Sequence, residues 1–452
     1  MPPMGKTSRL IPTTSLIAAL TFGSRILGLA RECVFSHYFG TSELLSAFRI
    51  AFMVPNLARR LFGEGALSAA TIPVLTESLQ EHGEDRSRQF VGALLVLLLV
   101  ILGATVVVVE IVIACWRTVQ DDLALQLAAV LMPYMVLICL VAIGGGVLNV
   151  RHHFSIPAAV PMLLNIAIVV AAIAAAGWGS LTGIKLMYVI CAAVLIAGVL
   201  QLCATGIALH AVAFFPVLNC RWRDPQIRKV MTLMGPMVLG LSAVQINSLV
   251  DYLIAYLFIG EVGQRGGPAV LGYAQYLYQL PLGVFGIALA TAIFPLLSQK
   301  AAERDLTGLA DVVHRGVRLS LFIALPASVG LIFVAYPLVA TLYEHGASDA
   351  TATQRIAGTL VFYSLGLVAY FTQHILVRTF YATHNSRTPA RVALTMVGIN
   401  FLMNLSLVFV LQERGLALAT AVCAGIQVIW LSRLLAREVP EIRWRKLRPV
   451  AM

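Results

Sequence analysis

The chain has 452 residues, of which 59% are hydrophobic and only 12% are charged. This composition excludes an ordinary soluble globular protein, in which about a quarter of the residues are charged. The formal net charge is +11 at pH 7, which in a soluble protein would suggest nucleic acid as a partner. Here the charge accompanies apolar segments long enough to cross a bilayer, so we expect a membrane protein that binds no nucleic acid.

Apolar runs of about 20 residues, the length of a membrane-spanning helix, recur along the whole chain. We expect an all-α polytopic protein of about twelve transmembrane helices, with connections too short to hold a soluble domain. The expected spans are residues 13–36, 44–79, 90–114, 124–149, 156–177, 185–212, 229–259, 268–298, 314–343, 354–381, 389–411 and 415–436.

The cations are distributed unevenly between the expected loops. With a cytoplasmic N-terminus, the inner loops and tails hold 21 Lys and Arg residues and the outer loops hold 5. This bias predicts that both termini are cytoplasmic. The basic tail Arg443–Arg448 fits that topology and contact with anionic lipids. Arg25 and Arg31 interrupt the first apolar run and no convincing cleavage site follows, so we expect a first helix and no signal peptide.

The chain contains an internal repeat. The segment His152–Ala158 (HHFSIPA) precedes the fifth expected span, and His384–Ala390 (HNSRTPA) precedes the eleventh, 232 residues later. The repeat predicts two six-helix lobes, with a central cationic cavity where they meet, as in many secondary transporters. We therefore expect an N-terminal lobe at 1–215, a cytoplasmic linker at 216–228, and a C-terminal lobe with a basic tail at 229–452.

Five arginines lie inside or beside the first two expected spans, namely Arg25, Arg31, Arg49, Arg59 and Arg60. A charged side chain at the bilayer centre costs about 3 kcal/mol or more, so such residues normally face a protein interior or a watery cavity. Several cations in one cavity indicate an anionic ligand, and the arginine fork suits phosphate. The alternative is structural: Arg59 and Arg60 anchor the topology, and Arg25 pairs with a carboxylate elsewhere.

Three further positions are candidates for function. Pro55-Asn56 predicts a break in the second span, and Glu64, between two glycines, is spaced to pair with Arg60 as a gating ion pair. Asp251 lies inside the seventh span, where an acidic residue is a candidate for binding a cation or a proton. Gln245, Asn247 and Ser248 are its expected helpers, and a structural pair with an arginine of the first half is the alternative for Asp251.

The sequence lacks motifs for enzymatic chemistry. It contains no GxxxxGK[ST] phosphate loop, no HExxH zinc motif and no CxxC pair among its 7 cysteines. We therefore expect a transporter without covalent catalysis, metal or organic cofactor. Coupling to a monovalent cation or a proton, or a response to the membrane potential, stays open.

At this point the residues match a known family. The segments SRILGLAR and AFMVPNLARRLFGEGALSAATIPVLTE, followed by HHFSIPAAVPMLLNI, YQLPLGVFGIALATAIFPLLS and THNSRTPARVA, resemble the MurJ/MviN family of lipid II flippases in order along the chain. The resemblance implies the fold of the MOP exporters, which include the MATE transporters. It implies that the chain moves undecaprenyl-diphosphate-linked peptidoglycan precursor from the inner to the outer leaflet of the bacterial inner membrane. Membrane lipids and cell-wall synthesis proteins are the implied partners.

Residue by residue, the resemblance assigns the substrate-binding arginines to Arg25, Arg31 and Arg59, the gating glutamate to Glu64, and the break to Pro55-Asn56. The chain also departs from the family pattern. Ser46 replaces an acidic residue, and Tyr276 replaces an arginine of the eighth span. Arg49, one turn beyond Ser46, is a candidate to compensate for the lost cation, and Arg49 and Asn56 complete the expected substrate-binding set. Many members also have two additional C-terminal spans.

Other functions stay open on the sequence alone. A transporter of the same fold could carry another polyprenyl-linked oligosaccharide or a small molecule, although the arginines disfavour cationic drugs. A membrane-embedded transferase would need an acidic or histidine cluster at one membrane face, and the sequence shows none. A degenerate scaffold without transport activity is a third alternative, motivated by Ser46 and Tyr276.

Overall fold

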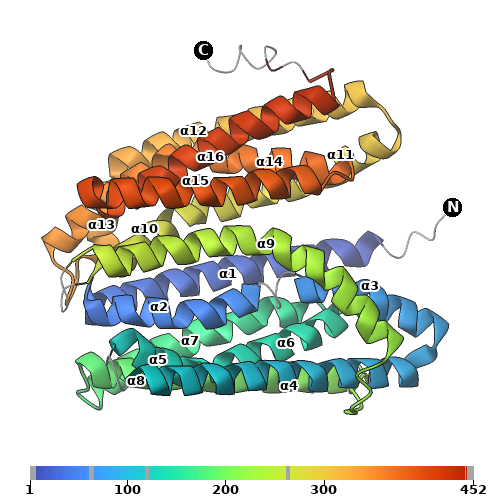
Figure 1. Ribbon diagram of the computed structural model, residues 1–452, viewed down its shortest axis with the longest axis horizontal. Helices are drawn as coiled ribbons and strands as arrows, with labels where there is room; N and C mark the ends of the chain where they lie inside the picture. The colour runs from blue at the N-terminus through green and yellow to red at the C-terminus, as the bar shows by residue number, and fades with distance from the viewer. Residues whose placement is uncertain (1–6, 61–65, 118–121, 261–264, 443, 445–452) are drawn as a thin grey trace. The chain divides into compact units, whose positions relative to one another are not determined.

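The computed structural model describes residues 7–60, 66–117, 122–260, 265–442 and 444, and every regular element in these ranges is helical. The first half contains α1 (Thr7–Phe39), α2 (Glu43–Ala58), α3 (Ala66–Glu81), α4 (Gly83–Arg117), α5 (Leu123–Leu131), α6 (Pro133–Val150), α7 (Ser155–Gly177) and α8 (Gly183–Ala211) (Figure 1). The second half contains α9 (Pro225–Phe258), α10 (Gly267–Pro281), the π-helical turn η2 (Leu282–Gly286), α11 (Ile287–Ala302), α12 (Leu306–Tyr343), α13 (Ala350–Leu365), α14 (Leu367–Ala382), α15 (Arg387–Leu411) and α16 (Glu413–Glu438).

Each expected span coincides with one helix or with consecutive helices. Among the described residues, eight helical stretches are long and apolar enough to cross a membrane, or nine when α13 and α14, bent by 43°, count as one span. The remaining three expected spans correspond to α1, to α2 with α3, and to α9. These are the helices that carry the intramembrane arginines and Asp251. The chain is thus a multi-span membrane protein, and the count of twelve crossings stays a prediction.

The chain folds into two compact units. The first comprises Met1–Phe39 and Leu44–Ser242, and the second comprises Gly40–Glu43 and Ala243–Met452. The boundary thus falls inside α9, later than the linker expected at 216–228. Those linker residues lie in the first unit because they form hydrogen bonds with α4, for example from Arg221 to Gln89.

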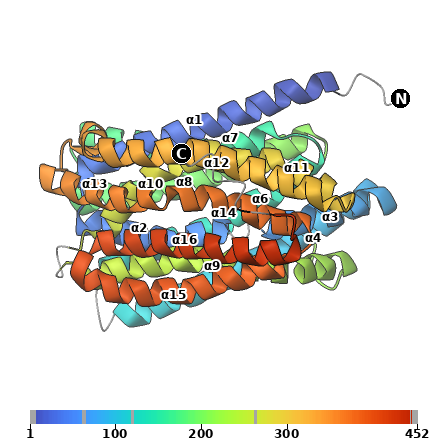
Figure 2. The same ribbon diagram turned by 90° about the horizontal axis from the view of Figure 1, so that it is seen from above.

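In the first unit, helices from both ends of its sequence pack together. α7 packs against α8 and α1, and α6 packs against α3, α4 and α8 (Figures 1 and 2). One buried cluster joins α3, α4 and α6 to the segment after α8 and to the start of α9 through Leu67, Phe90, Val147, Phe214 and Val230. The start of α9 is therefore held by apolar packing that belongs to the first unit.

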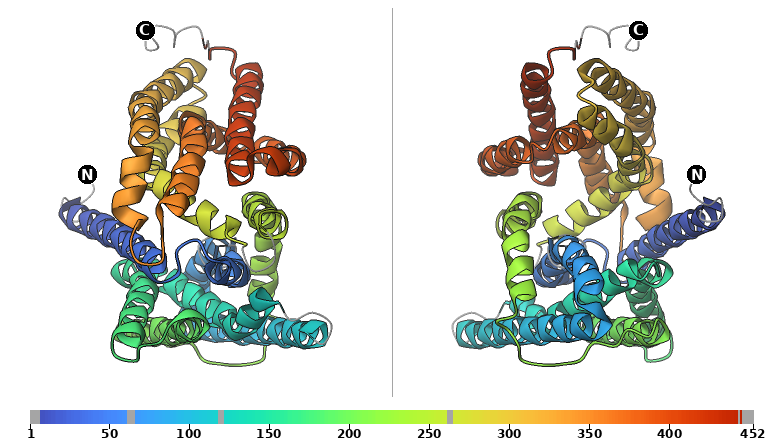
Figure 3. Two further views of the ribbon diagram at one scale, coloured as in Figure 1. Left: turned by 90° about the vertical axis from the view of Figure 1, so that its left-hand side faces the viewer. Right: turned by 90° about the vertical axis from the view of Figure 1, so that its right-hand side faces the viewer.

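In the second unit, α12 packs on α13 and α14, while α16 packs on α13, α14 and α15 (Figure 3). A buried cluster includes Leu309, Val313, Phe380 and Leu431, and Trp444 packs against it from beyond α16. Trp444 also donates a hydrogen bond from its ring nitrogen to the Ser432 carbonyl, at 3.1 Å. The apolar core of this unit thus includes a residue of the basic C-terminal segment.

The repeated sequence segments adopt the same turn. His152 and His384 have positive φ angles of 58° and 59°. The next amide donates to the carbonyl five residues earlier in both cases, from His153 to Leu148 at 2.8 Å and from Asn385 to Phe380 at 2.9 Å. This left-handed residue and its hydrogen bonds form a helix C-cap that reverses the chain before α7 and α15. The two turns share one geometry, as the repeat predicts.

Candidate functional site

A buried carboxylate joins two of the predicted arginines. Glu32 of α1 is 1% exposed. Its Oε1 accepts from Nη2 of Arg31 at 2.7 Å, and its Oε2 accepts from Nη2 of Arg49 at 2.6 Å. Each carboxylate oxygen thus has a charge-assisted hydrogen bond, and the cluster of three side chains carries one net positive charge.

The cluster extends to α7 through Asn165, a residue that the sequence analysis did not single out. Nη1 of Arg31 donates to Oδ1 of Asn165 at 3.0 Å, and Nδ2 of Asn165 donates to the Ser24 carbonyl at 3.4 Å. The Arg31 guanidinium also lies over the Phe35 ring, 5.9 Å from its centroid. Arg31 is therefore held in one orientation by three different side chains. The signal for Asn165 was an amide inside an otherwise apolar expected span.

Arg59 lies close to the predicted Asn56. Nε of Arg59 donates to Oδ1 of Asn56 at 3.1 Å. The expected break does not occur at Pro55-Asn56, because α2 continues through Pro55 to Ala58 and the next two residues stay helical in a π-type turn. Proline removes one backbone hydrogen bond and can bend a helix without ending it.

Four other residues singled out from the sequence belong to this region of the chain. Arg25 lies on α1 and Arg60 follows α2, and both side chains are partly buried. Glu64 lies outside the described residues, so the structure does not test its pairing with Arg60. Ser46, the departure from the family pattern, is completely buried on α2.

Asp251 of α9 lies in a buried polar cluster of the second unit. Its side chain is 2% exposed. Oδ1 accepts from Nδ2 of Asn404 at 2.6 Å, and Oδ2 accepts from the Thr420 hydroxyl at 3.3 Å. Nδ2 of Asn404 also donates to Oδ1 of Asn400 at 2.7 Å. The carboxylate is thus surrounded by neutral groups of α15 and α16.

These partners lie on other helices than the expected helpers. The sequence predicts Gln245, Asn247 and Ser248 as helpers of Asp251, and that stays a prediction, whereas the hydrogen-bond partners described above come from helices more than 150 residues away. Asn400 and Asn404 lie four residues apart in an apolar span, which places them on one helix face. The sequence alone shows that the two asparagines share a helix face. Only the tertiary fold shows that this face packs against α9.

The Asp251 cluster has the chemistry of a site for a small hard cation. Such ions prefer oxygen ligands, and carboxylate, amide and hydroxyl oxygens meet here. Oδ1 of Asn404 is buried without a hydrogen-bond partner among the described residues. A buried acceptor of this kind is costly unless something satisfies it. No group of three or more His, Cys, Asp or Glu residues suited to a metal ion occurs in the described ranges.

Gln275, next to the departure at Tyr276, belongs to a second polar network in the same unit. Its Oε1 accepts from the Tyr252 hydroxyl at 3.2 Å, and its Nε2 donates to the Tyr363 hydroxyl at 3.1 Å. The Tyr363 ring stacks on Tyr278 with centroids 4.8 Å apart. Neutral hydrogen bonds and aromatic packing therefore surround Gln275, the residue before the departure at Tyr276.

Solved structures define the class of protein. A MATE family multidrug transporter of the MOP superfamily, in an inward-facing conformation, matches with a TM-score of 0.73 and 15% identity over 94% of this chain and 99% of that chain. A lipid II flippase MurJ in an inward closed conformation matches with a TM-score of 0.80 and 27% identity, over 93% of this chain and 87% of that chain. The chain therefore shares the fold of these two transporters.

The sequence comparisons then show the family. The model of the family described as lipid II flippase MurJ matches residues 35–451. A lipid II flippase MurJ of Burkholderia cenocepacia is 32% identical over 92% of this chain and 81% of its own length. A probable lipid II flippase MurJ of Rhizobium tropici is 31% identical over 96% of this chain and 83% of its own. The chain belongs to the lipid II flippase MurJ family.

Proposed function

We propose that this protein is a lipid II flippase of the bacterial inner membrane. It moves undecaprenyl-diphosphate-linked peptidoglycan precursor from the inner to the outer leaflet by alternating access, without covalent catalysis. The observation that carries the proposal is the pair of intramembrane arginines, Arg31 and Arg49, held side by side by the buried Glu32. Such an arrangement retains net positive charge within the membrane, where an anionic headgroup needs a partner.

The diphosphate is bound by Arg25, Arg31 and Arg59, and Arg49 supplies the cation that the family pattern lacks here. Arg25 lies 15 residues before the turn at Gly40–Glu43, and Arg59 lies 16 residues after it. Counted along the two helices, these two arginines are therefore at nearly the same distance from the turn. The forked guanidiniums suit a diphosphate, which presents several oxygens to bidentate donors.

Glu32 affects both the stability of the arginine pair and the binding of the substrate. An isolated pair of neighbouring guanidiniums would repel each other, and the shared carboxylate reduces that repulsion. An incoming diphosphate competes with Glu32 for the Arg31 and Arg49 donors. Substrate release is then assisted because the carboxylate regains its two hydrogen bonds. Asn56 orients the Arg59 guanidinium, and Glu64 with Arg60 forms the proposed gating pair.

The Asp251 cluster supplies the proposed coupling site, for either a monovalent cation or a proton. Asp251 would hold the ion with the oxygens of Asn400, Asn404 and Thr420. The unsatisfied Oδ1 of Asn404 supports a cation, because an ion would satisfy that acceptor. Proton uptake by the carboxylate is the alternative, since a buried carboxylate costs less when it is neutral.

Complementation tests the proposed function. Cells depleted of their own lipid II flippase would express the chain, its Arg25→Ala and Arg59→Ala variants, and Arg315→Ala as a matched control on the exposed surface of α12. Membrane levels are compared by immunoblot. We expect rescue by the wild type and by Arg315→Ala, but not by the other two variants.

Different outcomes of this experiment test the proposed function and the proposed binding site separately. Rescue by all four proteins would retain the flippase function and reject the assignment of Arg25 and Arg59. Absence of rescue by the wild type, despite equal insertion, would indicate another polyprenyl-linked cargo or a degenerate transporter.

A further inference from the structure

The segment between α8 and α9, residues 212–224, is fastened tightly to the first unit; we call it the strap. Phe214 is completely buried, and the Arg151 guanidinium lies 5.6 Å from its ring centroid. Nη2 of Arg88 donates to the Ala213 carbonyl at 2.6 Å, and the Val217 amide donates to the Arg88 carbonyl at 3.1 Å. The strap thus begins with one aromatic anchor and two backbone attachments to α4.

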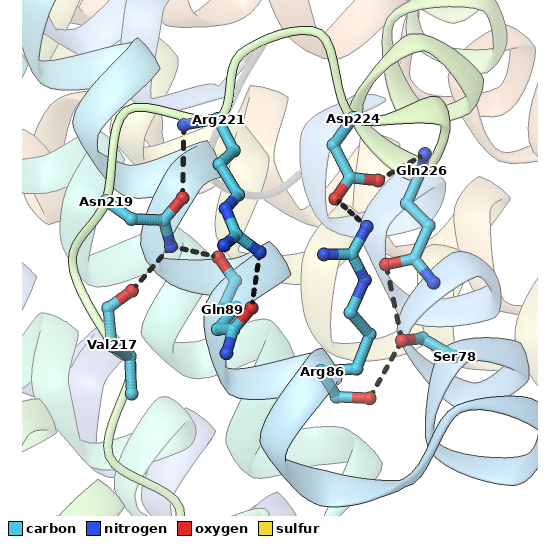
Figure 4. Close-up of polar contacts among 9 residues, drawn as sticks. Ser78, Arg86, Gln89, Val217, Asn219, Arg221, Asp224 and Gln226 are labelled. Atoms are coloured by element: carbon cyan, nitrogen blue, oxygen red, sulfur yellow. Dashed lines mark hydrogen bonds and ion pairs between the residues drawn. The ribbon is translucent and has the colours of Figure 1, made fainter.

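Its second half is attached by side chains, as Figure 4 shows. Nδ2 of Asn219 donates to the Gln89 carbonyl at 2.8 Å, and Nη1 of Arg221 donates to Oε1 of the same glutamine at 3.0 Å. Asp224 forms an ion pair with Arg86 at 2.7 Å. These contacts fix the backbone of the strap, so the side chains that point away from α4 are held in place as well.

The outer surface of the strap is apolar and cationic. Phe215 is 59% exposed, Leu218 is 68% exposed, and Trp222 is also exposed. Arg223 of the strap and Arg228, in the adjoining first turn of α9, are exposed, and their guanidiniums make no hydrogen bond or ion pair with the described residues. In both views of Figure 3 the strap runs along the outer edge of the first unit, outside its helices.

The position of the strap in the chain places it at the membrane interface. It directly follows α8, which is long and apolar enough to cross the membrane, and it leads into α9. The strap therefore lies where a span meets the membrane surface. Aromatic side chains are enriched at that depth, and arginines there attract anionic headgroups. A soluble partner would not explain why large apolar groups occupy the level of the membrane interface.

We propose that the strap is a binding site for anionic phospholipid. Phe215, Leu218 and Trp222 enter the boundary between headgroups and acyl chains, while Arg223 and Arg228 bind the headgroup phosphates. The chemistry resembles that of interfacial amphipathic segments, although the strap is an extended chain held by α4. The inference is independent of the transported substrate.

Quenching of Trp222 fluorescence by brominated lipids tests the site. The full chain is placed in nanodiscs with increasing fractions of brominated phosphatidylglycerol or brominated phosphatidylcholine. The same series with Trp222→Phe is subtracted, because the chain has 5 tryptophans. We expect half-quenching of the Trp222 signal at a several-fold lower fraction of the anionic lipid, since one arginine near the surface contributes about fivefold in affinity.

Two double variants test which arginines cause the preference for anionic lipid. Arg223→Gln with Arg228→Gln should abolish the preference, whereas Arg387→Gln with Arg391→Gln removes the same charge from the second unit and should preserve it. Equal quenching by both lipids would overturn the proposal. So would equal quenching of the wild type and of Trp222→Phe, because Trp222 would then not contact the lipid. Loss of the preference when inorganic phosphate replaces chloride at constant ionic strength would also overturn it, because the site would then bind free phosphate.

Discussion

At the scale of single residues, Glu32 decides whether two arginines can lie side by side in the first unit. One oxygen bonds Arg31 and the other bonds Arg49, and the side chain is almost completely buried, so water cannot readily replace either partner. Removal of one partner from a buried charged set is strongly destabilising, because it leaves charge without compensation.

We therefore predict that Glu32→Gln destabilises the protein by about 3 kcal/mol. Glutamine keeps the size of the side chain but leaves two neighbouring guanidiniums facing one amide. Glu32→Gln combined with Arg49→Gln should recover part of the lost stability, because both charges of the Glu32–Arg49 ion pair are then removed together. Unfolding of the purified protein in detergent, followed by circular dichroism, measures the effect.

Glu43→Gln is the control for this prediction. Glu43 lies in the first turn of α2, where its charge interacts favourably with the helix dipole and stabilises the protein by at most about 1 kcal/mol. A Glu32→Gln protein as stable as the Glu43→Gln protein would contradict the role of Glu32. So would a double variant less stable than Glu32→Gln alone.

The contact between Asp251 and Asn404 allows a charge exchange. Asp251→Asn should remove the proposed dependence of lipid II translocation on an ion gradient, because no carboxylate remains in the cluster. Asp251→Asn with Asn404→Asp returns a carboxylate across a contact of only 2.6 Å, and we expect it to restore part of that dependence. Translocation in proteoliposomes with an imposed sodium or pH gradient identifies the ion.

Membrane insertion and fluorescence-detected chromatography should be equal for these variants. Gradient-dependent transport by Asp251→Asn would contradict the assignment of the coupling site. Dependence on pH but not on sodium in the wild type would select the proton.

At the scale of elements, α4 and the strap illustrate how a missing side chain permits a contact. A Cβ atom on Gly92 would lie 1.9 Å from the Val217 carbonyl oxygen, which belongs to the strap backbone. The strap crosses α4 at this point because glycine leaves room for it. Gly103, on the same helix, has no neighbouring atom within 4 Å of such a Cβ.

We predict that Gly92→Ala destabilises the protein by about 1–3 kcal/mol, the typical cost of overpacking. Gly103→Ala should be neutral or stabilising by up to about 1 kcal/mol, since alanine favours helix. Thermal unfolding in detergent measures both. Limited trypsin digestion should cut Gly92→Ala faster after Arg221 or Arg223, and equal digestion of the two variants would show that the strap does not depend on Gly92.

At the scale of the whole molecule, the positive-inside bias predicts which loops face the cytoplasm. Cys220 is exposed in the strap, and Ser180 is exposed in the loop between α7 and α8, at the other end of α8. We predict that a membrane-impermeant maleimide labels Cys220 only in inverted vesicles. Ser180→Cys should be labelled in intact spheroplasts, in a chain whose other exposed cysteines, Cys115 and Cys203, are serine.

Labelling of Cys220 in intact spheroplasts would reverse the predicted orientation, and equal labelling from both sides would show a broken permeability barrier. A C-terminal fluorescent protein provides an independent check, since it is expected to fold and fluoresce only when the C-terminus is cytoplasmic.

The sequence by itself determined the class of fold and the family, because long apolar runs must become helices in a bilayer and because the family motifs are contiguous. It also located Arg31, Arg49, Arg59 and Asp251, since a charge inside an apolar run is conspicuous. Only the tertiary structure decided their partners. Asn165 meets Arg31, and Asn404 meets Asp251, across more than 130 residues. Helix periodicity gives the face of a residue but not the helix that packs against it, so such pairings, and the crossing of the strap over Gly92, are settled by packing.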